Sequence, residues 1–332
     1  VYKLKGPYAE IVDFEAPFTG LHTNATSDFF FTRSDDNFEA ANCYFLIDAS
    51  MRWINDSLGI DLGPYQYSTG VRVDPHGLSG DDNSHYIPST GQLAFGDGGV
   101  DDAEDVGVVL HEFGHGVHDW ATAGSLSQVT GLSEGCGDYW TTSYIRNTNI
   151  LTPAHPAYNW VFAWDGHNPF WDGRIVNYTA HYPEGLTGSI HTDGQMWASS
   201  LMSIWDLIGK EATDINFIEA LAMTNGSSNQ QDAANAFIAS DQTNVGGSHL
   251  AQIIPVFADR GYIEGPITPD FSANITSGNA PLTVQFTDLS ISQPNPLTSW
   301  QWDFDNDGTV DATVEDPTWV YNNFGLYTVK LT

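Results

Sequence analysis

The stretch His111-Glu112-Phe113-Gly114-His115 determines how the rest of this 332-residue chain is interpreted. On a helix, residues four positions apart lie on the same face, so both imidazoles can reach one ion. Histidines at this spacing are typical zinc ligands, and the adjacent Glu112 can take a proton from a metal-bound water. The apolar run Val106–Leu110 favours a helix here, with Asp101 or Asp102 as the expected N-cap.

Glu134, nineteen residues after His115, is the predicted third metal ligand. It lies in a second helical pattern, Gly131–Trp140, for which Ser133 is the expected cap. Glu134 and Asp138 share a helix face, so we expect Glu134 on the metal and Asp138 behind it, accepting the free N–H of a ligand histidine. The alternatives are an exposed helix with two solvated histidines and an ordinary acidic first turn. Both alternatives are disfavoured because the HExxH motif and the two carboxylates, Glu134 and Asp138, occur together.

These residues, His111–His115 followed by Glu134-Gly-Cys-Gly-Asp138, resemble the gluzincin metallopeptidases, most closely the fungalysin and thermolysin groups. The resemblance extends over most of the first 260 residues. It implies an α+β domain of two lobes, a mixed N-terminal lobe with the HExxH helix and an α-rich C-terminal lobe, with one catalytic Zn²⁺ in the cleft between them. Asp82–Tyr86 resembles the family's edge strand, which implies that Asn83 and Ser84 bind the substrate backbone.

Two further segments imply roles for His191 and Arg174. Gly188–Trp197 is similar to the family segment whose histidine stabilises the oxyanion of the tetrahedral intermediate, which implies that role for His191. Gly173–Asn177 is similar to the segment whose arginine binds the substrate carbonyl, which implies that role for Arg174. The alternative for Arg174 is a surface salt bridge, and the alternative for His191 is an ordinary histidine at a helix start.

One position departs from the thermolysin pattern. That group places an oxyanion-binding tyrosine between the second histidine and the glutamate ligand, and the corresponding stretch of this chain contains none. Either His191 and Arg174 suffice, or a tyrosine such as Tyr139 or Tyr178 comes in from elsewhere. The gap favours a fungalysin-like organisation.

The resemblance implies a secreted zinc endopeptidase that hydrolyses internal peptide bonds of extracellular proteins. Glu112 would act as general base and then deliver the proton to the leaving amine. A zinc exopeptidase of related architecture is an alternative, but it needs a group that grips the substrate's free amine, and the sequence shows no dedicated acidic motif. A non-catalytic extracellular binding or adhesion protein is disfavoured by the intact Glu112, Glu134 and His191.

The excess of acidic over basic residues excludes negatively charged binding partners. The chain carries 42 acidic and 10 basic residues, a formal net charge of −32, which excludes nucleic acids and anionic membranes as partners. Such an excess of negative charge repels itself, and Ca²⁺ is therefore an open candidate as a structural ion. Asp101, Asp102 and Asp105 could contribute to one calcium site, although helix capping explains them better.

Other features fit an exported protein. No run of about 18 apolar residues is present, so we expect no membrane span. The chain opens at Val1 without a signal peptide, and we expect a mature product of a zymogen that has lost its leader and propeptide. Cys43 and Cys136 are the two cysteines, and the sequence leaves open whether they form a disulfide or stay buried thiols.

Periodicity predicts the remaining elements of residues 1–264, the expected catalytic domain. Apolar residues at helical spacing predict a helix over 38–58 and, further on, helices over 191–209, 213–224, 230–240 and 247–260. The long irregular stretch 152–188 is expected to shape substrate pockets.

A domain boundary is predicted at Gly265–Pro269, followed by a second domain over 265–332. Alternating apolar residues predict strands at Asp270–Ala273, Leu282–Thr287, Ser299–Phe304 and Tyr327–Leu331. They favour a small all-β, Ig-like sandwich, and the set resembles a PKD-type domain. The chain stops inside or just after the last strand, so we expect a truncated end.

The PKD-type resemblance implies a spacer or a module that binds substrate, a cell surface or extracellular matrix. Asp303–Gly308 also imitates the opening of an EF-hand calcium loop, but position twelve of that loop would be Val314 instead of glutamate. A tight acidic turn is the better interpretation of this segment.

Overall fold

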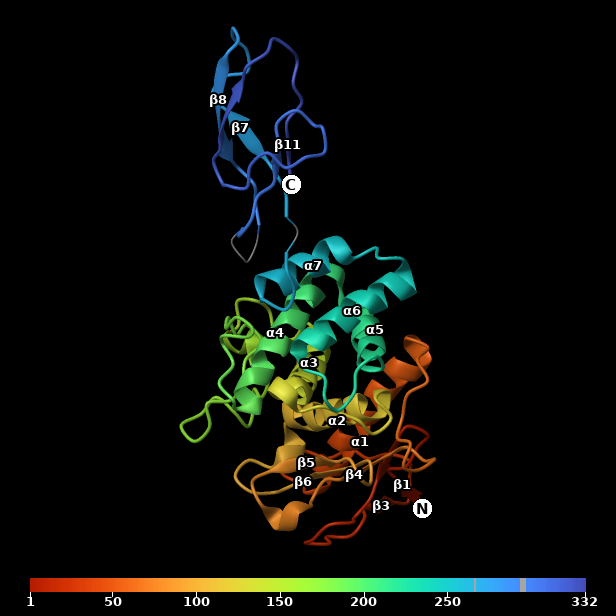
Figure 1. The fold of residues 1–332 in the computed structure, drawn as a ribbon. Coiled ribbons are helices and arrows are strands. Elements are labelled where there is room, and N and C mark those ends of the chain that lie inside the picture. Colours follow the sequence, from red (N-terminus) through yellow and green to blue (C-terminus); the bar gives the residue numbers. More distant parts are fainter. Residues whose placement is uncertain (266, 293–296) are drawn as a thin grey trace. The chain divides into compact units, whose positions relative to one another are not determined.

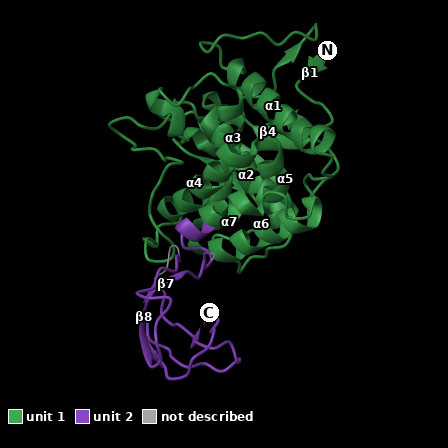
Figure 2. Cartoon of the chain, turned by 90° about the horizontal axis from the view of Figure 1, so that it is seen from above, with its two compact units in different colours: residues 1–256 green, residues 257–332 purple. Residues whose placement is uncertain are grey.

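A computed structural model of the chain describes residues 1–265, 267–292 and 297–332 (Figure 1). The chain divides into two compact units, Val1–Val256 and Phe257–Thr332 (Figure 2). The first unit mixes helices and strands, and the second is built mainly from short strands. The domain boundary predicted between residues 264 and 265 lies slightly further along the chain and stays a prediction.

A four-stranded sheet forms one side of the first unit, in the order β2-β4-β6-β5. Its first three strands are parallel and β5 runs antiparallel to β6, so β5 is an edge strand with one free side. Val71, Val73, Leu93 and Phe95 are fully buried and hold the sheet against the helices. The strands are β2 (Ala9–Ile11), β4 (Val71–Asp74), β5 (Ser84–Ile87) and β6 (Gln92–Phe95), with β1 (Tyr2–Lys3) and β3 (Thr23–Asn24) forming a separate pair.

Helix α2 (Val106–Ala121) carries the HExxH motif and is almost entirely buried, packing on β5 and β6 as well as on α3 and α5. Asp105 is its N-cap, with a side-chain oxygen that accepts from the Gly107 N–H at 2.6 Å. The prediction of Asp101 or Asp102 as cap is therefore wrong. Asp101 precedes a 3₁₀ turn, η3 (Asp102–Glu104), and Asp102 is the first residue of that turn. Both residues therefore lie before the helix and not at its cap.

Helix α3 (Leu132–Asn147) starts two residues earlier than a cap at Ser133 requires. Gly131, in the left-handed region at φ 72°, is the N-cap, and Ser133 lies inside the first turn. The cap prediction is wrong because the Ser133 hydroxyl is used elsewhere: it contacts His115 Nδ1 at 2.8 Å.

Two glycines let α2 and α3 approach each other closely. A Cβ at Gly114 would lie 2.6 Å from the Gly137 Cα, and a Cβ at Gly137 would lie 2.4 Å from His111 Nδ1. Neither position can carry a side chain without pushing the helices apart, because real Cβ contacts are longer than these distances. The close contact brings Glu134 on α3 within reach of the two histidines on α2.

The predicted helices of the first unit are present, together with the long irregular segment before α4. Helix α1 ends in a π-helical turn, Trp53–Ser57, and the irregular segment contains only a short 3₁₀ turn, Pro156–Asn159. The helices are α1 (Asn37–Arg52), α4 (Ile190–Ile208), α5 (Lys210–Leu221) and α6 (Gln230–Val245), followed by α7 (Leu250–Asp259) at the division between the units.

The second unit has an aromatic core between two small antiparallel sheets, β10-β8-β7 and β11-β9. Trp302 and Phe304 are fully buried in this core, against Val284, Phe286 and Tyr321. The strands are β7 (Phe271–Ala273), β8 (Leu282–Asp288), β9 (Trp302–Asp303), β10 (Thr318–Tyr321) and β11 (Lys330–Leu331). An all-β unit is thus present, while the assignment to the PKD type stays a prediction.

Three smaller expectations concern cysteines, acidic turns and membrane spans. Cys43 on α1 and Cys136 on α3 are free, buried thiols, so the disulfide alternative is not realised. Asp303 accepts from the backbone N–H groups of Asp307 and Gly308 at 3.2 and 2.9 Å, as expected for a tight acidic turn. Among the described residues, no helix combines the length and apolar character that a membrane span needs.

Candidate metal centre and active-site cleft

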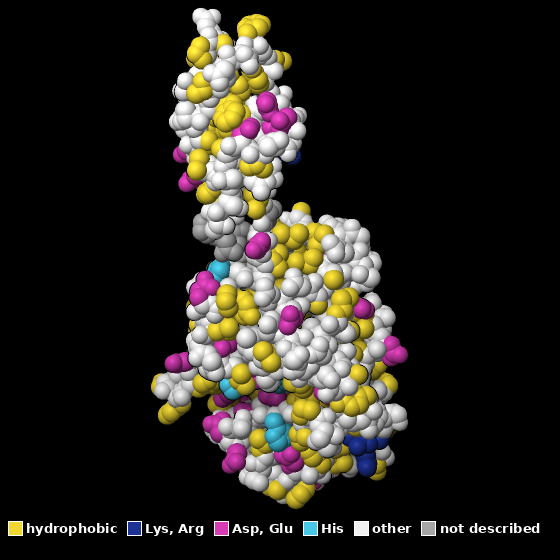
Figure 3. Space-filling view, viewed as in Figure 1, with side chains coloured by type: hydrophobic (Ala, Val, Ile, Leu, Met, Phe, Trp, Pro, Cys, Tyr) yellow, Lys and Arg dark blue, Asp and Glu magenta, His cyan; other side chains and the backbone are white. Residues whose placement is uncertain are grey.

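A cleft of about 1070 Å³ lies in the first unit. Its walls come from β5, the segment around η3, helices α2 and α3, the irregular segment 162–174 and the start of α4. Figure 3 shows acidic and histidine side chains gathered along a groove across this unit. The cleft has the size and mixed polarity of a site for a peptide or a comparable ligand.

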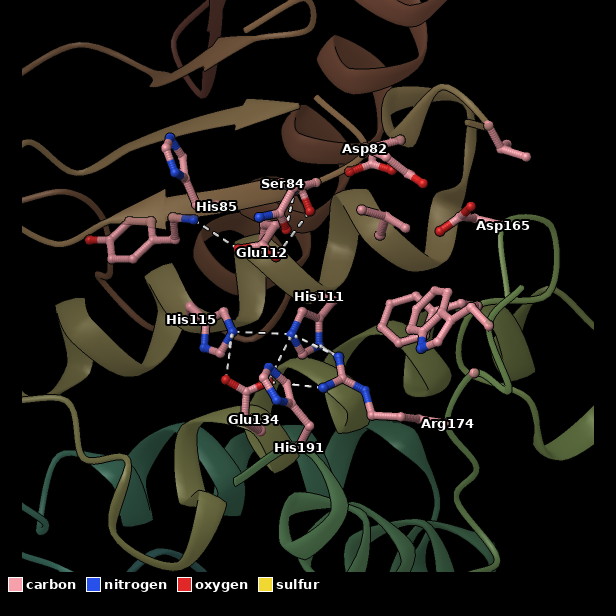
Figure 4. A pocket seen from close by; sticks show the side chains of 18 of the residues that line it. Asp82, Ser84, His85, His111, Glu112, His115, Glu134, Asp165, Arg174 and His191 are labelled. Carbon is pink, nitrogen blue, oxygen red and sulfur yellow. Dashed lines mark hydrogen bonds and ion pairs between the residues drawn. The ribbon is translucent and has the colours of Figure 1, made fainter. Parts of the chain in front are cut away.

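His111, His115 and Glu134 point toward one another in the cleft (Figure 4). The two histidine Nε2 atoms are 3.1 Å apart, and each lies 3.5 or 3.7 Å from a Glu134 carboxylate oxygen. Tetrahedral zinc with bonds of about 2.0–2.1 Å would hold its ligand atoms about 3.3 Å apart. The three side chains therefore fit one zinc ion without rearrangement of the helices.

Both histidines are oriented by groups behind them. Asp138 Oδ1 lies 3.0 Å from His111 Nδ1, and the Ser133 hydroxyl lies 2.8 Å from His115 Nδ1. Each ring thus keeps Nε2 for the centre of the cluster, the arrangement expected around a zinc ligand. Burial lowers the pKa of His115, whereas for His111 the carboxylates of Asp138 and Glu134 outweigh burial and the Arg174 charge and raise the pKa to about 9.

Glu112 is held in place by hydrogen bonds from the edge strand β5. Its carboxylate accepts from the Tyr86 backbone N–H at 2.8 Å and from the Ser84 hydroxyl at 3.2 Å. These contacts fix the carboxylate at the cleft, beside the histidines of its own helix. Ser84, predicted as a substrate-binding residue, thus contacts Glu112, the expected general base.

Arg174 is buried and contacts two carboxylates of the centre. Its Nη1 donates to Glu134 Oε2 at 2.9 Å, and its Nε lies 3.1 Å from Asp138 Oδ1. The guanidinium also stacks over the Phe162 ring, 4.7 Å from its centroid. With a side chain only 9% exposed, Arg174 does not form the surface salt bridge that was its alternative. Although burial opposes it, this positive charge and the histidines lower the pKa of Glu134 strongly.

His191 and Asn83 lie at the open side of the cleft. The His191 side chain is 65% exposed at the start of α4, and its Nε2 is 3.5 Å from Glu134 Oε2. Asn83 lines the cleft just before β5. The structure brings both predicted residues to the site, and their exposure leaves them accessible to a ligand.

No tyrosine hydroxyl takes the place of the missing family residue among the residues that line the cleft. Tyr86 is the lining tyrosine, and its hydroxyl donates to Asp119 at 2.6 Å. Tyr139 is fully buried, with its hydroxyl on Asp214, and Tyr178 is not in the cleft wall. Neither tyrosine considered from the sequence reaches the site.

An acidic group of the cleft wall has no counterpart in the sequence interpretation. Asp82, Asp102 and Asp165 place carboxylate oxygens within 4.8 Å of one another and all line the cleft. Burial, with repulsion from neighbouring carboxylates, raises the pKa of Asp102 to about 8 and that of Asp165 to about 6. The three residues come from separate segments, so no local spacing in the sequence indicates the group.

An apolar wall completes the cleft opposite the carboxylates. Phe162, Phe170 and Trp171 line it, and the rings of Phe162 and Trp171 lie 4.8 Å apart. The Phe170 side chain is 97% exposed. As expected for segment 152–188, this irregular stretch contributes directly to the shape of the site.

The chain is similar in sequence to part of several curated proteins. No protein-family model matches the chain. It is similar to the extracellular metalloproteinase MEP of Pyricularia oryzae (24% identity over 198 residues, 50% of this chain and 31% of that protein). It is also similar to the MEP of Fusarium vanettenii (25% over 197 residues, 48% and 30%) and to extracellular metalloproteinase 4 of Arthroderma gypseum (27% over 199 residues, 49% and 31%).

The chain spans about a third of the length of these curated relatives. The similarity covers about half of this chain at about 25% identity. The site thus holds three side chains that fit zinc, in a chain similar to part of three proteins named extracellular metalloproteinases.

Proposed function

We propose that this chain is the catalytic part of a secreted zinc endopeptidase. The observation that carries the proposal is the cluster of His111, His115 and Glu134 in the cleft. The two histidine Nε2 atoms are 3.1 Å apart, His111 Nε2 lies 3.5 Å from Glu134 Oε2, and His115 Nε2 lies 3.7 Å from Glu134 Oε1. When bound there, zinc supplies a Lewis acid that polarises a carbonyl and lowers the pKa of water toward neutrality.

The remaining steps are assigned to side chains of the cleft. Glu112, fixed by Tyr86 N–H and Ser84, takes the proton of the attacking water and then delivers it to the leaving amine. His191, with an exposed imidazole, donates to the oxyanion that develops on the scissile carbonyl. Arg174 holds Glu134 and Asp138 in place and orients the carbonyl.

Edge strand β5 supports cleavage within a chain. Its free side offers main-chain hydrogen bonds, so an extended peptide can add to the sheet as a further strand, with Asn83 next to it. Binding of this kind uses backbone on both sides of the scissile bond and does not need a chain end. The relatives are named extracellular metalloproteinases, which supports secretion and protein substrates.

The test combines metal content with cleavage of an internally quenched peptide blocked at both ends. Wild type and Glu112→Gln should each hold about one zinc, while only wild type cuts, with a loss of about 10²–10⁴-fold in the variant. Glu211→Gln, an exposed glutamate on α5, is the matched control and should keep full activity. Zinc-free wild type, or equal cleavage by Glu112→Gln, would contradict the proposal.

An exopeptidase is the second candidate, and one observation favours it. Asp82, Asp102 and Asp165 form an acidic group in the cleft wall that could grip a free amine. The blocked peptide separates the candidates, because an aminopeptidase leaves it intact and cuts the same peptide once its N-terminus is free. Absence of cleavage of both peptides by the zinc-loaded protein would favour the binding or adhesion alternative.

For the second unit, the sequence resemblance to a PKD-type domain is the basis of the proposal. We propose that it acts as a spacer or binds substrate, a cell surface or extracellular matrix. Binding to an insoluble protein substrate is compared between the whole chain and a chain ending at residue 264. Weaker binding by the shorter chain is expected for a binding module, and equal binding would contradict a binding role and leave the spacer role.

A further inference from the structure

A second group of potential metal ligands lies outside the cleft, beside the N-terminal end of α1. Glu39, in the first turn of α1, faces Asp101 and Glu104 of the segment around η3. One carboxylate oxygen from each residue lies within 4.8 Å of the other two. One calcium ion with bonds of about 2.3–2.6 Å spans up to about 5 Å between opposite ligands, so the three groups fit a single ion.

One carboxylate oxygen of this group is buried and has no hydrogen-bond partner. Glu39 is only 2% exposed, and its Oε2 is buried with no hydrogen-bond partner. A buried carboxylate oxygen in this condition costs free energy unless a cation or a donor satisfies it. Burial, with repulsion from Asp101 and Glu104, raises the pKa of Glu39, in keeping with an uncompensated site.

The surroundings of Glu39 are acidic. An adjoining cavity of about 590 Å³ is lined by Glu39 and Asp101, and no lysine or arginine appears among its lining residues as described. Asp13, also in this lining, has a second buried carboxylate oxygen without a partner, Oδ1. Two further acidic lining residues are already engaged: Asp97 pairs with His76 at 2.8 Å, and Asp74 accepts from the Phe14 and Glu15 backbone N–H groups.

The net charge of the group suits a divalent cation. Glu39, Asp101 and Glu104 carry three negative charges, and Arg33 pairs with Glu104 and adds one positive charge. Two negative charges then remain for the ion. Within the described part of the chain, neither Glu39 nor Asp101 has an ion pair with lysine or arginine that would neutralise them instead.

We propose that Glu39, Asp101 and Glu104 form a structural Ca²⁺ site, separate from the histidine centre. Calcium suits the group better than magnesium, because it accepts several carboxylates in irregular geometry, whereas magnesium keeps most of its waters. The ion would join the first turn of α1 to the turn that precedes α2, where Asn42 Nδ2 already donates to the Ala103 carbonyl at 2.8 Å. It would thereby hold the start of the helix that carries the HExxH motif.

The experiment titrates Ca²⁺ into the whole zinc-loaded chain after removal of calcium with EGTA, and follows heat of binding and Tm. Wild type should gain roughly 5–10 °C at a hundredfold excess over Kd. Glu39→Gln and Asp101→Asn should each lose one equivalent of bound calcium and this gain in Tm. Calcium-free Glu39→Gln should melt no lower than calcium-free wild type, because the substitution removes an uncompensated buried charge.

Asp305→Asn is the matched control, since it lies in another group of carboxylates, in the second unit, and should keep the Glu39-dependent gain. A wild type that binds no calcium would overturn the proposal. So would a Glu39→Gln variant that keeps the full uptake and the full rise in Tm. Because Asp101 is partly exposed, its variant keeps the test valid if Glu39→Gln folds poorly.

Discussion

The two candidate metal centres differ in how their ligands are distributed along the chain. His111 and His115 share one helix, and Glu134 follows on the next. The carboxylate centre joins Glu39 on α1 to Asp101 and Glu104, which lie far along the sequence. A metal centre whose ligands follow helical spacing can therefore be predicted from the sequence. A centre assembled from distant segments can be recognised only once the fold is known.

Selective metal removal should separate the two centres most strongly. Treatment with 1,10-phenanthroline should abolish peptide cleavage, a loss on the order of 10³-fold or more, because the catalytic Lewis acid is lost. EGTA at low concentration should leave most of the activity and lower Tm. Activity and Tm measured on the same samples check this, and rescue of phenanthroline-treated protein by Ca²⁺ alone would break the distinction.

Asp138→Asn tests how far the histidine centre depends on the group behind it. The amide cannot attract the His111 N–H as a carboxylate does, so zinc affinity should fall about 10–100-fold. Competition with a chromogenic chelator measures the change. Asp206→Asn removes a more exposed carboxylate that pairs with Arg146, and zinc affinity equal in both variants would sink the assigned role of Asp138.

His118 provides a contrast on the same helix. It is fully buried, neither ring nitrogen has a partner, and burial with the nearby His115 lowers its pKa to about 3. Because its pKa in the unfolded chain is near 6.5, its contribution to stability is complete above that pH and is lost as pH falls from about 6.5 to 3.

His118→Met should therefore flatten the acid side of the stability curve by up to about 1.4 kcal/mol per pH unit. Urea unfolding between pH 7.5 and 4 measures the slope. His155→Met, at an exposed histidine, should keep the wild-type slope. An unchanged slope in His118→Met would contradict the prediction, because it would mean that the His118 ring takes up a proton in the fold at the same pH as in the unfolded chain.

Ser84→Ala should have the smallest effect. The hydroxyl is one of two groups that hold Glu112, and the Tyr86 N–H remains, so kcat should fall only several-fold. KM should stay close to the wild-type value, because the lost hydrogen bond is to Glu112. Steady-state kinetics measure both constants, and a raised KM with an unchanged kcat would assign Ser84 to substrate binding alone.

The sequence predicted those parts of the site that depend on local spacing. The two histidines and Glu112 need only a helix, and Glu134 with Asp138 needs only a second one. Periodicity also predicted the helices of the first unit and strands β7, β8, β9 and β11 of the second, but not β10. Arg174, His191 and Asn83 came from the resemblance, and the structure places all three at the cleft.

The helix caps and the acidic group of the cleft could not be predicted from the sequence, because they depend on which of several side chains reaches a given contact in the fold. Asp105, Asp101 and Asp102 are equally good caps in isolation, and the turn η3 decides among them. Ser133 could cap α3, but its hydroxyl lies on His115 instead. The acidic group of Asp82, Asp102 and Asp165 requires three segments to meet, and no local pattern contains that information.

The contact of Gly114 with Gly137 has a consequence for how this protein can change. Where α2 meets α3 at these glycines, the approach of the helices is limited by direct contact with the main chain. Side chains elsewhere in the core can then be exchanged during evolution or engineering while the ligand geometry persists. A single added carbon at either glycine acts directly on the metal–ligand distances, so these two positions should be among the least replaceable of the chain.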